Sequence, residues 1–307
     1  MMEKFQSMGG SELTYSKLVS KLDPKYFAGI NLILNSTHES FLKKDYVNIV
    51  WNQHNIDQPA ISNMAHREYI KKVDYFVYVS HWQFEKYRYK FGIPEHKSIV
   101  LQNAVDEFSA TVKPKKIKLI YTSTPWRGLE VLLDCFHQLD RDDVELDVFS
   151  STSIYGTDFD KSTGPIYAEL FDRAKNMKNV NYRGFASNKD VRVALQNAHI
   201  FSYPCVWEET SCMSAIEAGM AGLNLVTTNL GALYETCGSW ARFISYDPNN
   251  SNLITKYTHA LNKTINQFWE EENQAKLSEQ SKYFNQFYGW NGRIKEWVNF
   301  LSQVNKK

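Results

Sequence analysis

The sequence predicts an α/β protein with two domains, each a doubly wound parallel sheet with helices on both faces. Short apolar runs alternate with amphipathic helical segments along most of the chain. Residues 112–118 interrupt this alternation with a proline and several lysines, so we expect domains at 1–111 and 112–284, then a C-terminal helix in 285–307. A length of 307 residues suffices for two hydrophobic cores.

The first domain is expected to alternate between strands and helices. Leu13, Leu18 and Leu22 lie on or near one face of a helix over 11–22. Strands are predicted at 28–34, 47–51, 75–79 and 97–101, with further helices at 62–72 and 82–91. We interpret the aromatic-rich segment 82–91 as core rather than as a surface that stacks bases.

The second domain repeats the pattern with six strands and four helices. Strands are predicted at 118–122, 145–149, 179–182, 198–203, 224–228 and 242–245, and helices at 128–138, 166–177, 188–197 and 211–221. Ligands of such sheets bind outside the carboxyl ends of the strands. The two crevices are expected to face each other.

The composition of the chain limits the classes of function and the cellular locations to be expected. The formal net charge is +1, so no global field attracts nucleic acid or membranes. No apolar run approaches the length of a membrane span, and the N-terminus has no signal-peptide pattern. The four cysteines are scattered, as expected of reduced thiols. We therefore expect a cytoplasmic protein with at most peripheral membrane contact.

Glu209 and Glu217 are the most informative pair of residues. Glu209 is expected in the loop before a helix that begins at Ser211, with Glu217 two turns inside it. The unpaired amides at such a helix start favour phosphate. We expect these amides to be those of Thr210, Ser211 and Cys212. Two carboxylates that can bind sugar hydroxyls then flank a diphosphate site, which predicts a nucleotide-sugar site.

This segment resembles the Glu-x7-Glu motif of the retaining "group 1" glycosyltransferases. Three further segments resemble motifs of that family, and a fourth matches its Gly-x-x-x-Glu motif. In chain order they are Gly9-Gly10-Ser11-Glu12, Asn103-Ala104-Val105-Asp106, Tyr121 to Leu129 with Arg127-Gly128, and Gly231 to Glu235. They occur in the family's order and span nearly the whole chain.

The resemblance implies the GT-B architecture, with two Rossmann-like domains and a C-terminal helix that crosses back onto the first. It implies a retaining hexosyltransferase that uses a UDP- or GDP-linked sugar, no other cofactor, and a carbohydrate or lipid-linked acceptor. Only eight residues precede Gly9, so the first domain is expected to be trimmed.

The resemblance also implies roles for single residues. Glu217 would hold the ribose, Glu209 the transferred sugar, and Arg127 the leaving diphosphate. Thr122 or Ser123 stands where the family has an additional arginine. The predicted catalytic residues are Arg127, Glu209 and His54, and the predicted donor-binding residues are Gly9, Gly10, Ser123, Arg183, Gly184, Thr210, Ser211, Cys212 and Glu217.

Each assignment has a structural alternative. Arg127 could be a surface residue, and the two glutamates could be solvated carboxylates that stabilise a helix start. Gly9-Gly10 alone is a generic turn, and His54 could be structural or merely exposed. Ser80 follows the strand at 75–79 and is expected to face the crevice, but it could equally serve as a helix N-cap. Lys189 is a weaker candidate than Arg183 for contact with the base.

We predict no metal site. Asp140-Arg141-Asp142 superficially resembles an Asp-x-Asp site, but it lies in a polar turn after a helix. Other functions stay open at this point: a sugar-nucleotide epimerase or phosphorylase of similar fold, a virus-type glycosyltransferase acting on nucleic acid, and a binding module without catalysis. The near-zero net charge disfavours nucleic acid, and the set Arg127, Glu209 and Glu217 disfavours a non-catalytic module.

Overall fold

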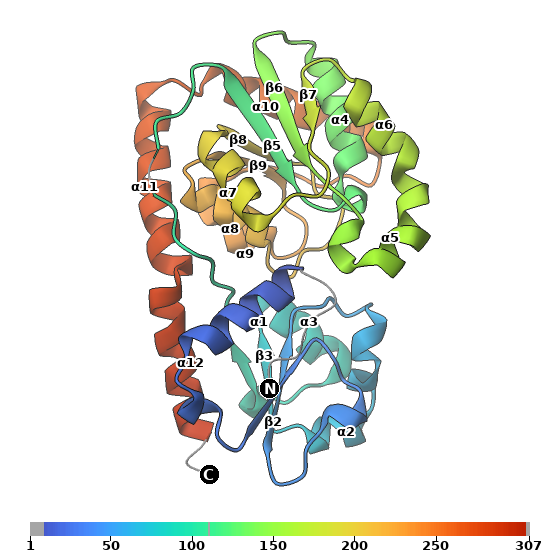
Figure 1. The fold of residues 1–307 in the computed structure, drawn as a ribbon, viewed down its shortest axis with the longest axis vertical. Coiled ribbons are helices and arrows are strands. Elements are labelled where there is room, and N and C mark those ends of the chain that lie inside the picture. The colour runs from blue at the N-terminus through green and yellow to red at the C-terminus, as the bar shows by residue number, and fades with distance from the viewer. Residues whose placement is uncertain (1–8, 110, 305–307) are drawn as a thin grey trace. The chain divides into compact units, whose positions relative to one another are not determined.

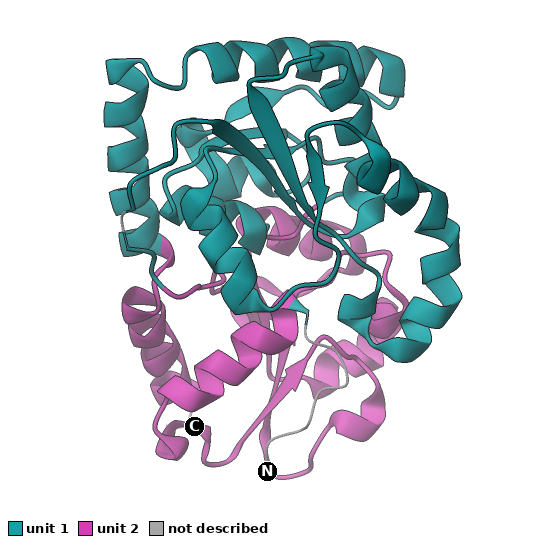
Figure 2. Ribbon diagram, turned by 45° about the horizontal axis from the view of Figure 1, so that its top comes forward, with its two compact units in different colours: residues 1–9, 107–208, 212–287 teal, residues 10–106, 209–211, 288–307 magenta. Residues whose placement is uncertain are grey.

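The structure is a computed structural model that describes residues 9–109 and 111–304. Its contacts divide the chain into two compact units (Figure 2). Unit 1 comprises Met1–Gly9, Glu107–Glu208 and Cys212–Phe287; unit 2 comprises Gly10–Asp106, Glu209–Ser211 and Tyr288–Lys307. The borders between these units, at 106/107 and 287/288, differ by five and three residues from the predicted domain borders at 111/112 and 284/285.

Unit 2 contains a four-stranded parallel sheet with the order β1-β2-β3-β4. Figure 1 labels its two central strands, β2 and β3. The strands are β1 Ile30–Leu34, β2 Val47–Asn52, β3 Tyr75–Tyr78 and β4 Ser98–Val100. The helices are α1 Gly10–Lys21, α2 Arg67–Lys72, α3 His81–Phe91 and α12 Trp290–Val304, with 3-10 turns η1 Pro24–Phe27, η2 Glu39–Phe41, η3 Pro59–Ala65 and η4 Glu95–Lys97.

Alternating side chains give this sheet two cores. Trp51 and Val77 point to one face, where they pack with residues of α1 and α12. The ring of Trp51 meets that of Trp297 edge-on at 4.7 Å. Val50 and Phe76 point to the other face, where η3, α2 and α3 pack. This alternation is the period of two of a strand with both faces buried.

Unit 1 contains a six-stranded parallel sheet with the order β10-β9-β8-β5-β6-β7. The strands are β5 Ile117–Thr122, β6 Val144–Phe149, β7 Val180–Tyr182, β8 Ile200–Tyr203, β9 Asn224–Thr228 and β10 Arg242–Ile244. The helices are α4 Leu129–Leu139, α5 Thr157–Thr163, α6 Ala168–Asn176, α7 Asn188–Asn197, α8 Met213–Met220, α9 Leu233–Cys237, α10 Asn250–Asn266 and α11 Glu271–Tyr288, with 3-10 turns η5 Pro125–Arg127, η6 Ser153–Tyr155, η7 Gly164–Tyr167 and η8 Gly238–Trp240.

The strand order of unit 1 reverses between β5 and β8. From β5 the chain steps to β6 and β7, then crosses back to β8 and proceeds to β9 and β10. Right-handed crossovers in opposite directions place helices on both faces of the sheet. The carboxyl ends of β5 and β8 therefore form the switch point, where ligands of doubly wound sheets bind.

The predicted α/β class with two parallel sheets is confirmed, but several helices differ from the prediction. The expected helix over 62–72 is broken at His66, whose backbone is extended. Asn63 donates its amide proton to Thr37 Oγ1, which holds the preceding 3-10 turn to the loop after β1. The helices α5, α9, α10 and α11 were not predicted from the sequence.

The aromatic segment 82–91 was wrongly assigned wholly to the core. In α3 only Gln83 and Tyr87 are buried, whereas Tyr89 is 95% exposed. The helix is amphipathic, and two aromatic side chains lie on its outer face.

Candidate functional site at the carboxyl ends of β5 and β8

The loops after β5 and β8 pack directly against each other in unit 1. Gly128 has φ +120°, and a Cβ at this position would lie 2.2 Å from the carbonyl oxygen of Pro204. Only glycine fits such a backbone conformation and such a close approach. Val206 also donates its amide proton to the carbonyl of Arg127 at 3.3 Å. The two loops at the switch point therefore form one continuous surface.

Helix α8 is hydrogen-bonded to the end of β5, next to this surface. Ser214, in its first turn, donates its hydroxyl proton to the carbonyl of Thr122 at the end of β5, at 2.7 Å. Ser123 Oγ lies 3.4 Å from the hydroxyl of Tyr203 at the end of β8. The predicted donor residue Ser123, the loop of Arg127 and the start of α8 are thus brought together.

The start of α8 differs from the prediction. The helix begins at Met213, because Cys212 has an extended backbone (φ −85°, ψ 95°) and serves as the N-cap without a side-chain hydrogen bond. Its first-turn amides therefore follow Cys212, and Thr210 and Ser211 precede the helix. The helix still ends as expected, with Gly222 at φ +70°.

Glu217 lies in α8 beside Arg192, an arginine that is not among the predicted site residues. Arg192 Nη1, in α7, lies 3.5 Å from Glu217 Oε1, and both side chains are largely buried. Arg192 is held by the carbonyl of Glu107 at 2.7 Å and by the ring of Phe108, 3.7 Å from its guanidinium carbon. Because 84 residues separate Phe108 from Arg192, no local motif could reveal this arrangement.

Arg127 ends η5 and is half-buried. The preceding Trp126 packs against three rings of the segment between β6 and β7, with centroids 5.8–6.0 Å apart. These rings belong to Tyr155, Phe159 and Tyr167. This aromatic cluster anchors the loop that carries Arg127.

Arg183 and Gly184 follow β7, as predicted. Arg183 is exposed and lies 3.4 Å from Asp147 Oδ1, whose side chain is nearly buried. Gly184 has φ +61° and lies against the ring of Tyr182. Lys189 is exposed in the first turn of α7.

In unit 2, His54 follows β2 in a loop held by α3. The carbonyl of His54 accepts hydrogen bonds from Gln83 Nε2 at 2.8 Å and from the hydroxyl of Tyr87 at 3.0 Å. Burial lowers the pKa of the imidazole below its usual 6.5, partly offset by Asp57. His54 is therefore a neutral ring in a fixed loop at neutral pH.

Glu209, Thr210 and Ser211 also belong to unit 2. Thr210 donates its hydroxyl proton to the carbonyl of Gln53, next to His54, at 2.7 Å. Glu209 is 5% exposed. The structure thus brings the loop of Glu209 to the loop of His54.

The structure also describes the predicted site candidates Ser80, Gly9 and Gly10. Ser80 accepts a hydrogen bond from the Gln83 amide at 3.0 Å, so the N-cap alternative is confirmed. Gly10 begins α1, and Gly9, directly before it, is buried. Residues 1–8 lie outside the described residues.

Within residues 9–109 and 111–304, no group of three or more His, Cys, Asp or Glu side chains could hold a metal ion. Asp142 forms an ion pair with Lys178, and Asp140 is the C-cap that follows α4, so this pair lies in a polar turn. None of the helices in the same ranges is both long and apolar enough to cross a membrane. All four cysteines are buried and free of disulfides.

Comparison with known proteins adds independent findings. The family model described as "Glycosyl transferases group 1" matches residues 102–284. The crystal structure of the pneumococcal O-GlcNAc transferase GtfA in complex with UDP and GlcNAc superposes with a TM-score of 0.65 at 13% identity. The match covers 97% of this chain but 61% of GtfA, so the chain spans less than two thirds of that protein.

Two other crystal structures match over more of their own length. A glycosyltransferase from Rickettsia africae has a TM-score of 0.68 at 14% identity, covering 100% of this chain and 85% of that one. The crystal structure of Anabaena Alr3699/HepE in complex with UDP and glucose has a TM-score of 0.67 at 13% sequence identity. The match covers 95% of this chain and 81% of that one. At such identities the similarity concerns the fold. No curated protein sequence matches the chain significantly.

Proposed function

The chain belongs to the glycosyl transferases group 1 family, and from this we propose that it transfers a sugar from a nucleoside-diphosphate donor to an acceptor hydroxyl. The observation that carries the proposal is the joined surface at the carboxyl ends of β5 and β8. There the Gly128–Pro204 contact holds the Arg127 loop beside the start of α8. This position is where doubly wound sheets bind nucleotides.

The donor would lie with its diphosphate over this surface. The first-turn amides of α8 and its dipole favour a bound phosphate, and the guanidinium of Arg127 can add a bidentate contact. Glu217 would accept hydrogen bonds from the ribose hydroxyls, with Arg192 fixing the orientation of its carboxylate. UDP is the first nucleotide to test, since the GtfA and HepE structures contain it, and GDP is the second.

In the transfer step, the bond from the anomeric carbon to the diphosphate oxygen breaks and a bond to the acceptor oxygen forms. We propose that both occur on the same face of the sugar, which retains the anomeric configuration, and that the leaving diphosphate takes the acceptor proton. Arg127 and the amides of α8 would stabilise the charge that develops on the leaving group. Glu209 and the neutral His54 would position the transferred sugar.

We further propose that the reaction needs no metal ion, because cations and helix amides can serve the diphosphate. A thermal-shift panel with UDP, GDP and ADP and their sugars tests the donor, since a ligand that binds the native state raises its melting temperature. With the donor known, NMR of the product gives the anomeric configuration. Full loss of transfer in EDTA, restored by Mg²⁺ or Mn²⁺, would overturn metal independence.

A further inference from the structure

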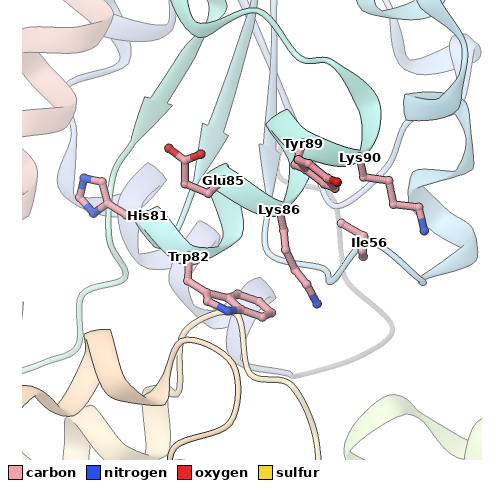
Figure 3. Close-up of a pocket in the computed structure, with 7 residues that line it drawn as sticks. All are labelled: Ile56, His81, Trp82, Glu85, Lys86, Tyr89 and Lys90. Atoms are coloured by element: carbon pink, nitrogen blue, oxygen red, sulfur yellow. The ribbon is translucent and has the colours of Figure 1, made fainter.

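Lys113, four residues before β5, has its ammonium group among backbone carbonyls of unit 1. Its Nζ donates hydrogen bonds to the carbonyl of Gln196 at 3.1 Å and to that of Ala221 at 3.0 Å, and the carbonyl of Leu195 lies at 3.4 Å. Lys90, by contrast, lines an open pocket on α3 (Figure 3). The side chain of Lys113 therefore binds within its own unit.

The carbonyls that Lys113 binds stand at the carboxyl ends of two helices. Leu195 and Gln196 lie in the last turn of α7, and Ala221 is the C-cap of α8. A cation stabilises this end of a helix, where carbonyls lack intrahelical partners and the dipole is negative. Burial lowers the pKa of Lys113 to about 8, which leaves the group charged at neutral pH. One ammonium group thus joins the ends of α7 and α8.

The two helices are joined one turn beyond the Arg192–Glu217 pair. Gln196 follows Arg192 by four residues in α7, and Ala221 follows Glu217 by four residues at the end of α8. Residues four apart in a helix lie one turn apart on the same side. The Ala221 amide donates to the Glu217 carbonyl at 3.0 Å. Lys113 therefore fixes the distance between the turns that carry the pair.

The segment before β5 also contacts Arg192 directly. The Glu107 carbonyl accepts a hydrogen bond from Arg192 Nη2 at 2.7 Å, and the Phe108 ring lies 3.7 Å from the guanidinium carbon. Thr111 donates its hydroxyl proton to the Gln196 carbonyl at 2.9 Å. This segment thus binds α7 at Arg192 and again one turn beyond it. The position of Arg192 depends on the segment as well as on α7.

We propose that Lys113 is a positioning residue for the nucleotide site, because it holds α7 and α8 in the arrangement in which Arg192 orients the carboxylate of Glu217. Lys113 does not itself touch the nucleotide. It acts through the pair, since its carbonyl partners lie one turn beyond the two side chains. The effect on the nucleotide rests on the proposed function, whereas the positioning of the pair does not.

Calorimetric titration of the whole chain with UDP and GDP tests the effect on the nucleotide. Lys113→Met keeps an unbranched side chain but removes the charge and the donors. It should weaken binding roughly fivefold or more, the usual size of a coupling between two sites. Lys113→Arg keeps the charge and the donors, so it should recover most of the lost affinity. Binding by Lys113→Arg that is no tighter than by Lys113→Met would overturn the role of the ammonium group.

Lys97→Met is the matched control. Lys97, in unit 2, binds the carbonyls of Ile70, Lys71 and Val73 at the carboxyl end of α2, at 2.7–3.2 Å. Its replacement also removes a cation from a helix end, but it should leave the nucleotide affinity unchanged. No weakening by Lys113→Met, or equal weakening by Lys97→Met, would overturn the positioning role.

A second measurement needs no nucleotide. A double-mutant cycle of Arg192→Met and Glu217→Ala, followed by urea unfolding, gives the energetic coupling of the pair. We expect this coupling to shrink when the cycle is repeated in the Lys113→Met background and to persist in the Lys97→Met background. Coupling of equal size in the two backgrounds would overturn the proposal.

The two measurements separate the proposal from the proposed function. Coupling that depends on Lys113, in a chain that binds no nucleoside diphosphate, would keep the positioning of the pair and overturn the proposed function. Nucleotide binding that does not depend on Lys113 would do the reverse. If Lys113→Met fails to fold, Lys113→Gln, whose shorter side chain retains donors, takes its place in both measurements with the same expected direction.

Discussion

Gly128 and Pro204 approach so closely that a methyl group at Gly128 would lie 2.2 Å from the Pro204 carbonyl oxygen. The two residues lie in the loops after β5 and β8, the neighbouring strands at which the sheet order of unit 1 reverses. This contact sets the distance between the loop of Arg127 and the turn that leads to α8.

Gly128→Ala should therefore destabilise the protein strongly. The change adds strain at φ +120° to a clash with rigid backbone, each of which costs roughly 1–3 kcal/mol. Gly92→Ala is the control, because Gly92 has φ +65° but no atom within 4 Å of the added Cβ. Urea unfolding should show the larger loss for Gly128→Ala, and equal losses would contradict the packing described.

The Arg192–Glu217 pair should govern nucleotide affinity. Glu217→Ala should weaken binding by roughly 1.5–3 kcal/mol, because charge-assisted hydrogen bonds to the ribose are lost. Arg192→Met should weaken it less, since the carboxylate remains but loses its orientation. Calorimetry should show coupling between the two changes in a double-mutant cycle.

Lys175→Met is the control for the cycle, since Lys175 forms an exposed ion pair with Asp172 in α6. It should leave the affinity unchanged. Unchanged affinity in Glu217→Ala would instead remove Glu217 from the ribose site.

Arg127 should act mainly on turnover. Arg127→Met removes charge that stabilises the leaving diphosphate, so kcat should fall roughly a hundred- to thousandfold, or about 3–4 kcal/mol. Donor affinity should fall less, because the charge on the leaving group grows in the transition state. Arg127→Lys should cost less, since only the bidentate fork is lost.

The control for Arg127 is Arg173→Met, which breaks a peripheral ion pair with Asp134. Turnover near the wild-type value in Arg127→Met would show that another cation serves the diphosphate. Arg183 would then be the next residue to replace.

His199 should make the fold sensitive to acid. The ring is fully buried; its Nδ1 accepts from the Lys118 amide at 3.0 Å and its Nε2 donates to the Pro114 carbonyl at 2.8 Å. Burial is the main reason that its pKa falls from 6.5 to about 4. The folded state thus resists protonation that the unfolded chain accepts.

The resulting stability is present above pH 6.5 and is lost as the pH falls towards about 4. The loss amounts to about 3 kcal/mol in the free energy of unfolding. His199→Gln retains a donor and an acceptor but does not titrate, so its stability should fall less over this range. Parallel pH profiles for the two proteins would contradict this account.

Much of the architecture was predictable, because buried parallel strands are short apolar runs separated by helices. The ten strands found within residues 9–109 and 111–304 lie at or within about two residues of their predicted positions, as β5 at Ile117–Thr122 illustrates. The helix α11 was missed because it is polar along much of its length, whereas α10 was missed although it buries an apolar face that includes Leu253, Tyr257 and Leu261. The start of α8 was misplaced because a Cys N-cap gives no capping signal.

The site was predictable only where a motif is local. Glu217 and Arg127 stand in recognisable segments, but Arg192 and the rings around Trp126 come from other elements. The exposure of Tyr89 could not be read from composition, since aromatic residues are ordinarily buried. These contacts depend on tertiary packing rather than on neighbouring residues.

The most direct test of the central claim is calorimetric titration of the purified chain with UDP and GDP. We expect one of them to bind at a single site, and Arg127→Met/Glu217→Ala to weaken that binding at least tenfold while still unfolding in one cooperative thermal transition, although at a lower temperature because Arg192 loses its ion pair. Absence of binding by every nucleoside diphosphate, or undiminished binding by this variant, would contradict a donor site at the carboxyl ends of β5 and β8.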